Sequence, residues 1–416
     1  MLPTWALRTN GAELDFRVCD DVPLRIHWCE QTDMKNAHRC KIQRRPWSNG
    51  GETHVETKIL ANLVLRQLFD AASSTYTYLL GDPRTRHAVF IDTVFEQHAR
   101  DHALLGELDL ELVAVLDTHC HADHVTGAWL MQQATGCRIG ISQRYQPPIQ
   151  GVDLPLDQDA RIAFGDRHLE VRATPGHTDG CMTLVLDDQS MAFTGDALLI
   201  RGTGRCDFQH GSAHVLYRSI TREIFSLPDG CLLFPGHDYS GRTVSSVIEE
   251  KTYNPRVGGA ADERDFVGFM ENLSLPHPKQ IDVAVPANMR SGRPADGNVQ
   301  RPADWGPVRQ TYAGLLEIEP DWVAEHLDQV HVLDVRQPQE MQESLGRIAA
   351  AQLIPLNELK ARLAEIPRDK PVVAVCHAGT RSAQATVILR SDGLTRCANL
   401  RGGMLLWKQL GLPAAG

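Results

Sequence analysis

The sequence predicts an α/β protein of two domains, the first built on a β-sandwich and the second a small doubly wound α/β domain. Three observations support this prediction. At 416 residues the chain exceeds what one hydrophobic core usually supports. Four strand-like runs in the first part of the chain each lead into histidine or aspartate residues. After a stretch rich in proline and glycine, strand-like and helix-like segments alternate.

The composition is typical of a soluble globular protein, with 42% hydrophobic and 23% charged residues. No apolar run approaches the roughly 20 residues that cross a bilayer. The net charge is −10 and there is no basic block, which argues against a nucleic-acid partner. The ten cysteines lack the dense spacing of a secreted scaffold. We therefore expect a cytoplasmic protein that has neither a membrane nor a nucleic-acid partner.

Residues 1–63 show no hydrophobic period and are expected to form a poorly ordered N-terminal extension. The first domain is expected to cover residues 64–300. It opens with β-branched and aromatic runs at 74–80 and 88–92, which predict a hairpin. A helix is expected at 95–108.

A buried strand is expected at 112–118, because an unbroken apolar run suits a strand covered on both faces. Active-site loops leave the carboxyl ends of such strands. Imidazoles two residues apart on a turn can reach one ion, and an Asp-His pair just beyond can reach the same ion or a neighbour. The candidates in this loop are His119, His121, Asp123 and His124.

Three further loops repeat the pattern. Strands are expected at 161–171 and 182–186, with His177 between them, and Asp196 and His237 follow two later strand-like runs. Separated loops of this kind can converge on one edge of a β-sandwich and hold distant ligands around one ion. Taken singly, each residue could be an ordinary polar loop residue, but together they predict a metal site.

A linker is expected at 301–313, within a stretch rich in proline and glycine that begins at Pro286. The second domain is expected to cover residues 314–416. Its apolar runs at 330–335 and 372–375 predict buried strands, and helical segments lie between and after them.

Cys376 follows the second of these strands directly and precedes a helical run. Backbone N–H groups and the positive end of a helix dipole stabilise a thiolate at such a position. Arg381 adds a full positive charge. A buried core cysteine is the plainer alternative, but glycine, arginine and serine in register favour a catalytic Cys376 assisted by Arg381.

The motifs THCHADH, GHTDGC, FTGDALLIRGTGRCDF and PGHDY resemble the metallo-β-lactamase superfamily, and within it the glutathione-linked branch of glyoxalase II and persulfide dioxygenase. Residues 66–80, 201–209 and 275–290 resemble persulfide dioxygenases more closely. Cys181 stands where a glyoxalase II usually has histidine. The resemblance implies a metallo-β-lactamase αββα sandwich for the first domain.

All seven ligands of a dinuclear site are present, so spacing alone does not distinguish one iron from two zincs. The resemblance implies one Fe(II) per chain, held by the residues that match His119, His177 and Asp196. Two histidines and a carboxylate leave positions open for a substrate thiolate and dioxygen. The remaining candidates, which would orient those ligands or hold a second metal, are His121, Asp123, His124 and His237.

The resemblance also implies oxidation of glutathione persulfide by O2 to sulfite and glutathione. Glutathione carries the reacting sulfur and brings two carboxylates, so arginines near the metal are the expected clamp. Each of these candidates could instead be structural. The candidate substrate-binding residues are Arg205, Tyr239, Arg256 and Arg290.

The second domain resembles a rhodanese sulfurtransferase through CHAGTRS, LDVRQPQE, LIPLNEL and RGGMLLW. Arg381 lies five positions after Cys376, one fewer than in related phosphatase loops, and the shorter ring suits sulfur. The resemblance implies that a Cys376 persulfide moves sulfane sulfur between glutathione persulfide plus sulfite and thiosulfate plus glutathione. The expected partners are these small molecules and a second copy of the chain in a homodimer.

Two rival functions stay open. One is a glyoxalase II-like thioesterase, in which a zinc-bound hydroxide attacks a glutathione thioester and no oxygen is consumed. The other is a persulfide carrier, in which Cys376 takes up sulfur but the metal site produces no sulfite.

Overall fold

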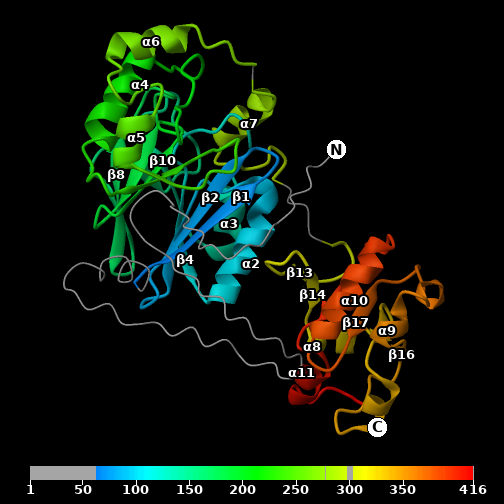
Figure 1. Cartoon of the computed structure of the whole chain (residues 1–416). Coiled ribbons are helices and arrows are strands. Elements are labelled where there is room, and N and C mark those ends of the chain that lie inside the picture. Colours follow the sequence, from blue (N-terminus) through cyan, green and yellow to red (C-terminus); the bar gives the residue numbers. More distant parts are fainter. Residues whose placement is uncertain (1–61, 277, 298–302, 416) are drawn as a thin grey trace, which may run out of the picture. The chain divides into compact units, whose positions relative to one another are not determined.

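The computed structural model describes residues 62–276, 278–297 and 303–415 (Figure 1). The predicted extension 1–63 thus lies outside the described residues, apart from its last two. The described residues form three six-stranded sheets. No helix in these ranges is long and apolar enough to cross a membrane.

The first sheet has the strand order β1-β2-β3-β4-β5-β6. β1 to β3 are antiparallel neighbours, which confirms the predicted hairpin, and β3 to β6 run parallel. The strands are β1 (Val64–Asp70), β2 (Thr75–Gly81), β3 (His87–Ile91), β4 (Glu111–Leu116), β5 (Arg138–Ser142) and β6 (Leu154–Leu156).

The second sheet has the order β12-β11-β10-β9-β8-β7 and is antiparallel except between β10 and β11. The single strand expected at 161–171 is wrong, because the chain turns at Gly165 with a φ of +76° and forms a hairpin. The strands are β7 (Arg161–Phe164), β8 (Arg167–Ala173), β9 (Met182–Leu186), β10 (Met191–Gly195), β11 (Leu232–Pro235) and β12 (Ser245–Ser246).

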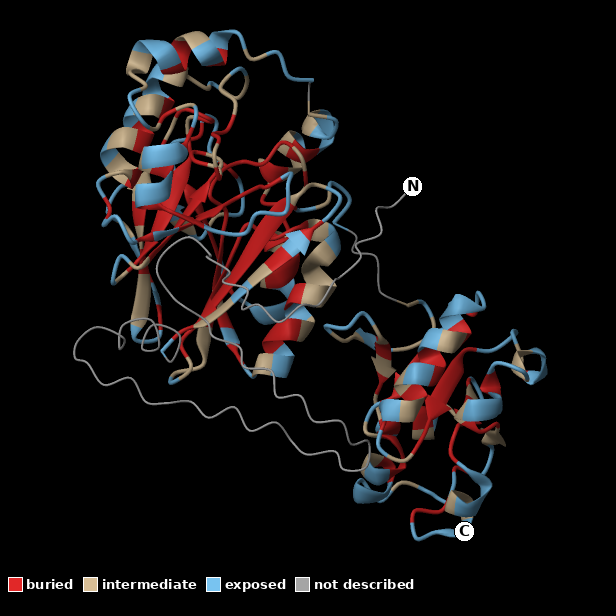
Figure 2. Ribbon diagram, in the orientation of Figure 1, coloured by how far each residue is buried: buried red, intermediate tan, exposed pale blue. Residues whose placement is uncertain are grey.

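These two sheets pack face to face and bury one shared core, which includes Tyr78, Leu116 and Phe193 (Figure 2). Helices cover both outer faces, so the predicted αββα sandwich is confirmed. The helices are η1 (Phe95–Gln97), α2 (His98–Leu108) and α3 (Ala128–Thr135), followed by α4 (Ala213–Ser219), η2 (Ile220–Ile224), α5 (Val247–Tyr253), α6 (Glu263–Glu271) and α7 (Ile281–Asn288).

The third sheet has the order β13-β14-β18-β17-β15-β16, and its neighbours are parallel except β13 and β14. Its strands are β13 (Arg309–Gln310), β14 (Leu316–Ile318), β15 (His331–Asp334), β16 (Gln352–Leu353), β17 (Val372–Val375) and β18 (Cys397–Leu400). Hydrophobic clusters lie on both faces of the sheet, which confirms the doubly wound fold. The helices are α8 (Pro320–Glu325), η3 (Pro338–Gln342), α9 (Leu356–Leu359), η4 (Leu363–Glu365), α10 (Thr380–Ser391) and α11 (Gly403–Gln409).

The stretch that was interpreted as a linker contains ordered elements at both ends. α7 continues through Pro286 to Asn288, so the linker interpretation is wrong for these residues. Within 301–313, Val308 is buried and β13 pairs with β14.

Candidate metal centre and candidate catalytic cysteine

The predicted metal ligands come together in two adjacent groups. The loop after β4 carries four of them, and His177, Asp196 and His237 follow β8, β10 and β11. The potential ligand atoms of His119, His177 and Asp196 all lie within 4.8 Å of one another. Those of the second group also lie within 4.8 Å of one another, and this group is His121, Asp123, His124 and His237.

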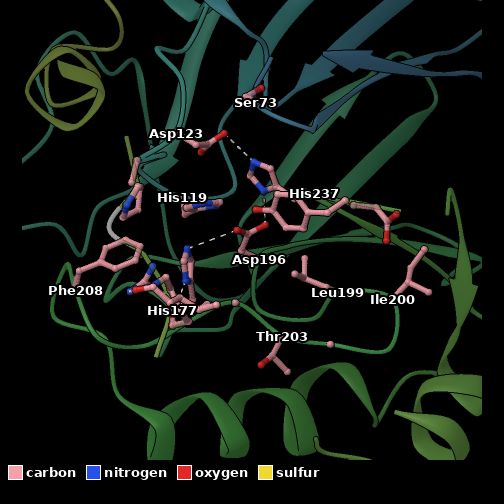
Figure 3. Close-up of a pocket in the computed structure, with 18 of the residues that line it drawn as sticks. Ser73, His119, Asp123, His177, Asp196, Leu199, Ile200, Thr203, Phe208 and His237 are labelled. Atoms are coloured by element: carbon pink, nitrogen blue, oxygen red, sulfur yellow. Dashed lines mark hydrogen bonds and ion pairs between the residues drawn. The ribbon is translucent and has the colours of Figure 1, made fainter. Parts of the chain in front are cut away.

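Hydrogen bonds orient the histidines of the first group. His177 Nδ1–H donates to the carbonyl of Arg205 at 2.6 Å, which leaves Nε2 free 3.7 Å from Asp196 Oδ2 (Figure 3). His119 Nδ1 lies 3.0 Å from Thr118 Oγ1. Because that hydroxyl donates to a carboxylate, it can accept from His119 and leave His119 Nε2 free as well.

The carboxylate behind this contact belongs to Asp92, which the sequence interpretation missed. Asp92 accepts hydrogen bonds from Thr118 N at 2.7 Å and from Thr118 Oγ1 at 2.8 Å. Its Oδ1 also lies 3.1 Å from His121 Nε2. Asp92 directly follows β3, so the pattern of a strand followed by an acidic residue could have identified it.

His237 joins the two groups through an ion-paired chain. Its Nδ1 lies 2.7 Å from Asp196 Oδ1, and its Nε2 lies 2.9 Å from Asp123 Oδ2 (Figure 3). Burial lowers the pKa of His237, but the charges of Asp196 and Asp123 outweigh burial and raise it well above its usual value. Both ring nitrogens of His237 thus face carboxylate oxygens, an arrangement that favours the protonated ring.

In the first group the histidine pKa values are lowered, whereas that of His237 is raised. Burial lowers the pKa of His119 well below its usual value and also lowers that of His177. Burial raises the pKa of Asp196, but His237 and the other histidines outweigh it and leave this pKa below its usual value. Two neutral imidazoles and one carboxylate are the protonation states that a divalent cation requires.

A pocket of about 670 Å³ opens onto the first group. His119, His177, Asp196 and His237 line it, and Phe208 packs edge-on against His177 with ring centroids 5.6 Å apart. A volume of this size is typical of small-molecule sites.

Three of the four predicted substrate-binding residues line this pocket. Arg205 donates to Asp207 and to the carbonyl of Pro276, Arg256 donates to the carbonyl of Thr203, and Tyr239 stacks on His237. The structure does not bring the fourth, Arg290, into the described lining of the pocket.

Lys279 also lines the pocket and was missed. Among the described residues neither Lys279 nor Arg256 has a carboxylate partner. These two cations therefore differ from Arg205, which Asp207 already neutralises.

Asn288 holds the histidine loop in place from the end of α7. Its Nδ2 donates to the carbonyls of His121 and His124 at 2.9 Å each, and its Oδ1 accepts from Thr126 N at 2.8 Å. The side chain is buried. Nothing in the local sequence predicts these contacts, because they join residues more than 160 positions apart.

Cys376 lies where the sequence predicted it, between β17 and α10. Gly379 N–H and Ser382 Oγ donate to its sulfur at 3.1 and 3.2 Å. Burial raises the pKa of the Cys376 thiol, but these hydrogen bonds and a further one from Ala378 outweigh it and lower the pKa. The loop therefore favours the nucleophilic thiolate.

Arg381 lies in the first turn of the helix after this loop, and its guanidinium is already paired with a carboxylate. Both of its terminal nitrogens donate to Glu340 of η3, at 2.7 Å each. The hydrogen bonds from Arg381 lower the pKa of the Glu340 carboxyl to about 2. Glu340 was not among the site residues predicted from the sequence.

Family comparisons agree with both sites. Residues 71–237 match the metallo-beta-lactamase superfamily model, and residues 319–410 match the rhodanese-like domain model. Fold and site thus define a metallo-β-lactamase-type metal centre in the same chain as a rhodanese-like domain.

Sequence relatives indicate which family within the superfamily the chain resembles. Mouse "Persulfide dioxygenase ETHE1, mitochondrial" is 53% identical over 235 residues, which cover 56% of this chain and 90% of that protein. The crystal structure of ETHE1 from Myxococcus xanthus matches with a TM-score of 0.53 and 48% identity, over 55% of this chain and 99% of that one. A metallo-beta-lactamase from Staphylococcus aureus matches with a TM-score of 0.52, over 82% of this chain and 98% of that one; at 21% identity it supports the fold alone. The chain belongs to the persulfide dioxygenase family and carries a C-terminal rhodanese-like domain.

This family implies a bound metal, and the described residues fit one. His119 and His177 each present an Nε2 towards Asp196, with the other ring nitrogen already hydrogen-bonded. In the second group, His121 Nδ1 and His124 Nε2 are buried without a hydrogen-bond partner. Unpaired buried imidazole nitrogens are costly, and a cation would satisfy them.

Proposed function

We propose that the chain uses one Fe(II) to oxidise glutathione persulfide with O2, giving sulfite and glutathione. His119, His177 and Asp196 would hold the ion, because their free ligand atoms converge on the wall of the pocket. When bound, Fe(II) supplies the redox chemistry that lets a persulfide react with dioxygen.

The observation that carries the proposal is that the two carboxylate oxygens of Asp196 have different contacts. Its Oδ1 is held by His237 and only Oδ2 faces His177, so one oxygen of this carboxylate is left to ligate an ion. The Nε2 of His237 in turn contacts Oδ2 of Asp123, a ligand that a second ion would need. Both contacts favour one ion over two.

The pocket suits glutathione persulfide. Glutathione is a tripeptide with two carboxylates, and Arg256 and Lys279 are the lining cations without a described carboxylate partner. We assign carboxylate binding to these two residues. Arg205 and Tyr239 would then shape the pocket, Arg205 through its bonds to Asp207 and Pro276.

Cys376 is proposed to transfer sulfane sulfur between glutathione persulfide and sulfite, through a persulfide on its own sulfur. The lowered pKa of the Cys376 thiol and its hydrogen bonds from Gly379 and Ser382 support a nucleophilic role. Sulfite made at the metal centre would thus be a substrate for the second domain.

The test combines metal analysis of anaerobically purified protein with an oxygen-electrode trace after addition of glutathione persulfide. We expect about one iron per chain and persulfide-dependent oxygen uptake. Two zincs per chain and a flat trace would contradict the dioxygenase.

One observation favours a second candidate function. The unpaired nitrogens of His121 and His124 could hold a second ion, as a dinuclear zinc thioester hydrolase requires. Hydrolysis of S-lactoylglutathione by the two-zinc protein would identify that enzyme. The cytoplasmic location and the homodimer stay predictions, which cell fractionation and size-exclusion chromatography would test.

A further inference from the structure

The arginines around the Cys376 loop are each paired with a carboxylate. Arg381, in the first turn of α10, makes a two-point ion pair with Glu340. Arg336 is buried and donates to Asp334 at 2.7 Å. Arg401, near the same loop, is also paired with a carboxylate.

Arg401 makes a two-point pair with Glu319, at 2.6 and 2.7 Å. It lies next to the loop, because Met404, three residues later, donates its backbone N–H to the carbonyl of Cys376 at 2.9 Å. Each of the three pairs has a formal charge of zero. A sulfur on Cys376 therefore faces no unbalanced guanidinium among the described neighbours.

The absence of an unpaired cation among the described neighbours should affect small inorganic anions more than glutathione persulfide. Thiosulfate and sulfite are small, and at neutral pH their negative charge lies within one or two bonds of the reacting sulfur. The carboxylates of glutathione persulfide lie many bonds from its sulfane sulfur. Charge repulsion with the Cys376 thiolate or persulfide is therefore stronger for the inorganic anions, unless a free cation offsets it.

We propose that Glu340 is a specificity-determining residue of the sulfurtransferase site. By holding both terminal nitrogens of Arg381, it directs the loop towards organic persulfides and away from small inorganic anions. This inference rests on the sulfur transfer proposed above for Cys376. Glu340 lies in η3, 41 positions before Arg381 in the sequence.

The transfer step balances without any oxidant. The Cys376 thiolate attacks the sulfane sulfur of glutathione persulfide, a new S–S bond forms, and the old S–S bond breaks with its electron pair leaving on the glutathione thiolate. The proton of the persulfide stays on the transferred sulfur. In the second half-reaction sulfite attacks the outer sulfur of the Cys376 persulfide, and a new S–S bond forms. The S–S bond to Cys376 breaks with its electron pair on the Cys376 sulfur, thiosulfate leaves, and the proton passes from the transferred sulfur to the Cys376 thiolate.

The experiment measures KM for thiosulfate and for glutathione persulfide as sulfur donors, in the full-length protein and its E340Q variant. Glutamine keeps the shape of the side chain but releases the charge of Arg381. We expect KM for thiosulfate to fall about fivefold or more, while KM for glutathione persulfide changes less than about twofold. Equal changes for both donors, or none, would overturn the inference.

A matched control is D392N, which removes the same charge from the exposed Arg368–Asp392 pair at the other end of α10. It should leave both KM values unchanged, because α10 separates it from the loop by roughly 16 Å. A second control combines E340Q with R381Q. If Glu340 acts by neutralising Arg381, the double variant, in which this pair again has no net charge, should lose the fall in KM for thiosulfate that E340Q alone shows.

A measurement on the unmodified protein guards against an E340Q variant that fails to fold. Because the loop charge is balanced, KM for thiosulfate should change less than about twofold between roughly 50 and 500 mM salt. A tenfold rise would show an unmasked cation and overturn the inference. Sulfur transfer that survives in C376S would instead overturn the proposed role of Cys376, so the two failures are distinguishable.

Discussion

Asp92 shows how one residue can orient several residues of the candidate metal centre. It fixes Thr118, which orients His119, and it contacts His121 directly. We predict that Asp92→Ala lowers iron affinity about 10- to 100-fold, because a carboxylate that hydrogen-bonds the residues around a metal ligand fixes the orientation of that ligand. Competition with a chelator would measure this.

The matched control for that variant is Asp109→Asn, since Asp109 is exposed and lies at the end of α2. Its iron affinity should equal that of the unmodified protein. An Asp92→Ala protein that folds and binds iron normally would contradict the role assigned to Asp92.

A second residue-scale prediction concerns pH. Because hydrogen bonds lower the pKa of Cys376, its thiolate should already form below the pH at which a free cysteine ionises. Ser382→Ala removes one donor to the sulfur, so the rate of alkylation by iodoacetamide should reach its midpoint at higher pH. At pH 7 we expect a roughly tenfold slower reaction, since a hydrogen bond to a charged group is worth about 1.5 kcal/mol. An unshifted pH profile would contradict this.

At the scale of elements, α7 supports the loop after β4. Asn288→Ala would leave Thr126 N–H and the carbonyls of His121 and His124 without partners in a buried site. We predict a loss of about 3 kcal/mol in the free energy of unfolding, together with weaker iron binding. Chemical denaturation and metal analysis would measure both.

The control for Asn288→Ala is Asn272→Ala, at the end of α6, where an exposed asparagine donates only to Gly268 within its own helix. Its unfolding free energy should change by less than about 0.5 kcal/mol. If both variants behaved alike, α7 would be an ordinary surface helix.

α11 supports the Cys376 loop in a similar way. A Cβ on Gly403 would lie 2.5 Å from the carbonyl oxygen of Cys376 and 2.9 Å from Ala378 N. We predict that Gly403→Ala lowers sulfur transfer at least about tenfold, because the loop must shift. Gly411→Ala is the matched control: both glycines have positive φ, but a Cβ on Gly411 meets nothing within 4 Å.

At the scale of the whole molecule, the two activities should separate. The sandwich and the third sheet have separate hydrophobic cores. The candidate metal centre is built from loops of the sandwich, and the Cys376 loop belongs to the third sheet. We predict that Cys376→Ser keeps persulfide-dependent oxygen uptake and loses sulfur transfer. His177→Ala should do the reverse. Loss of both activities in either folded variant would contradict this separation.

Much of the architecture could be predicted from the sequence because its signals are local. A strand that ends in histidine or aspartate identified His119, His177, Asp196 and His237, and a cysteine between strand and helix identified Cys376. The hairpin turn at Gly165 was missed, since a single glycine in an alternating run does not by itself break a strand.

The residue types at both centres, and the class of chemistry they favour, could be predicted from the sequence, because the ligands follow the strand ends within a few consecutive residues. The contacts that each of these residues makes depend on the folded chain. It divided the oxygens of Asp196 between His237 and the open site, brought Asn288 onto the histidine loop, and paired Arg381 with Glu340. These contacts join residues 41 or more positions apart, and only the folded chain sets such distances.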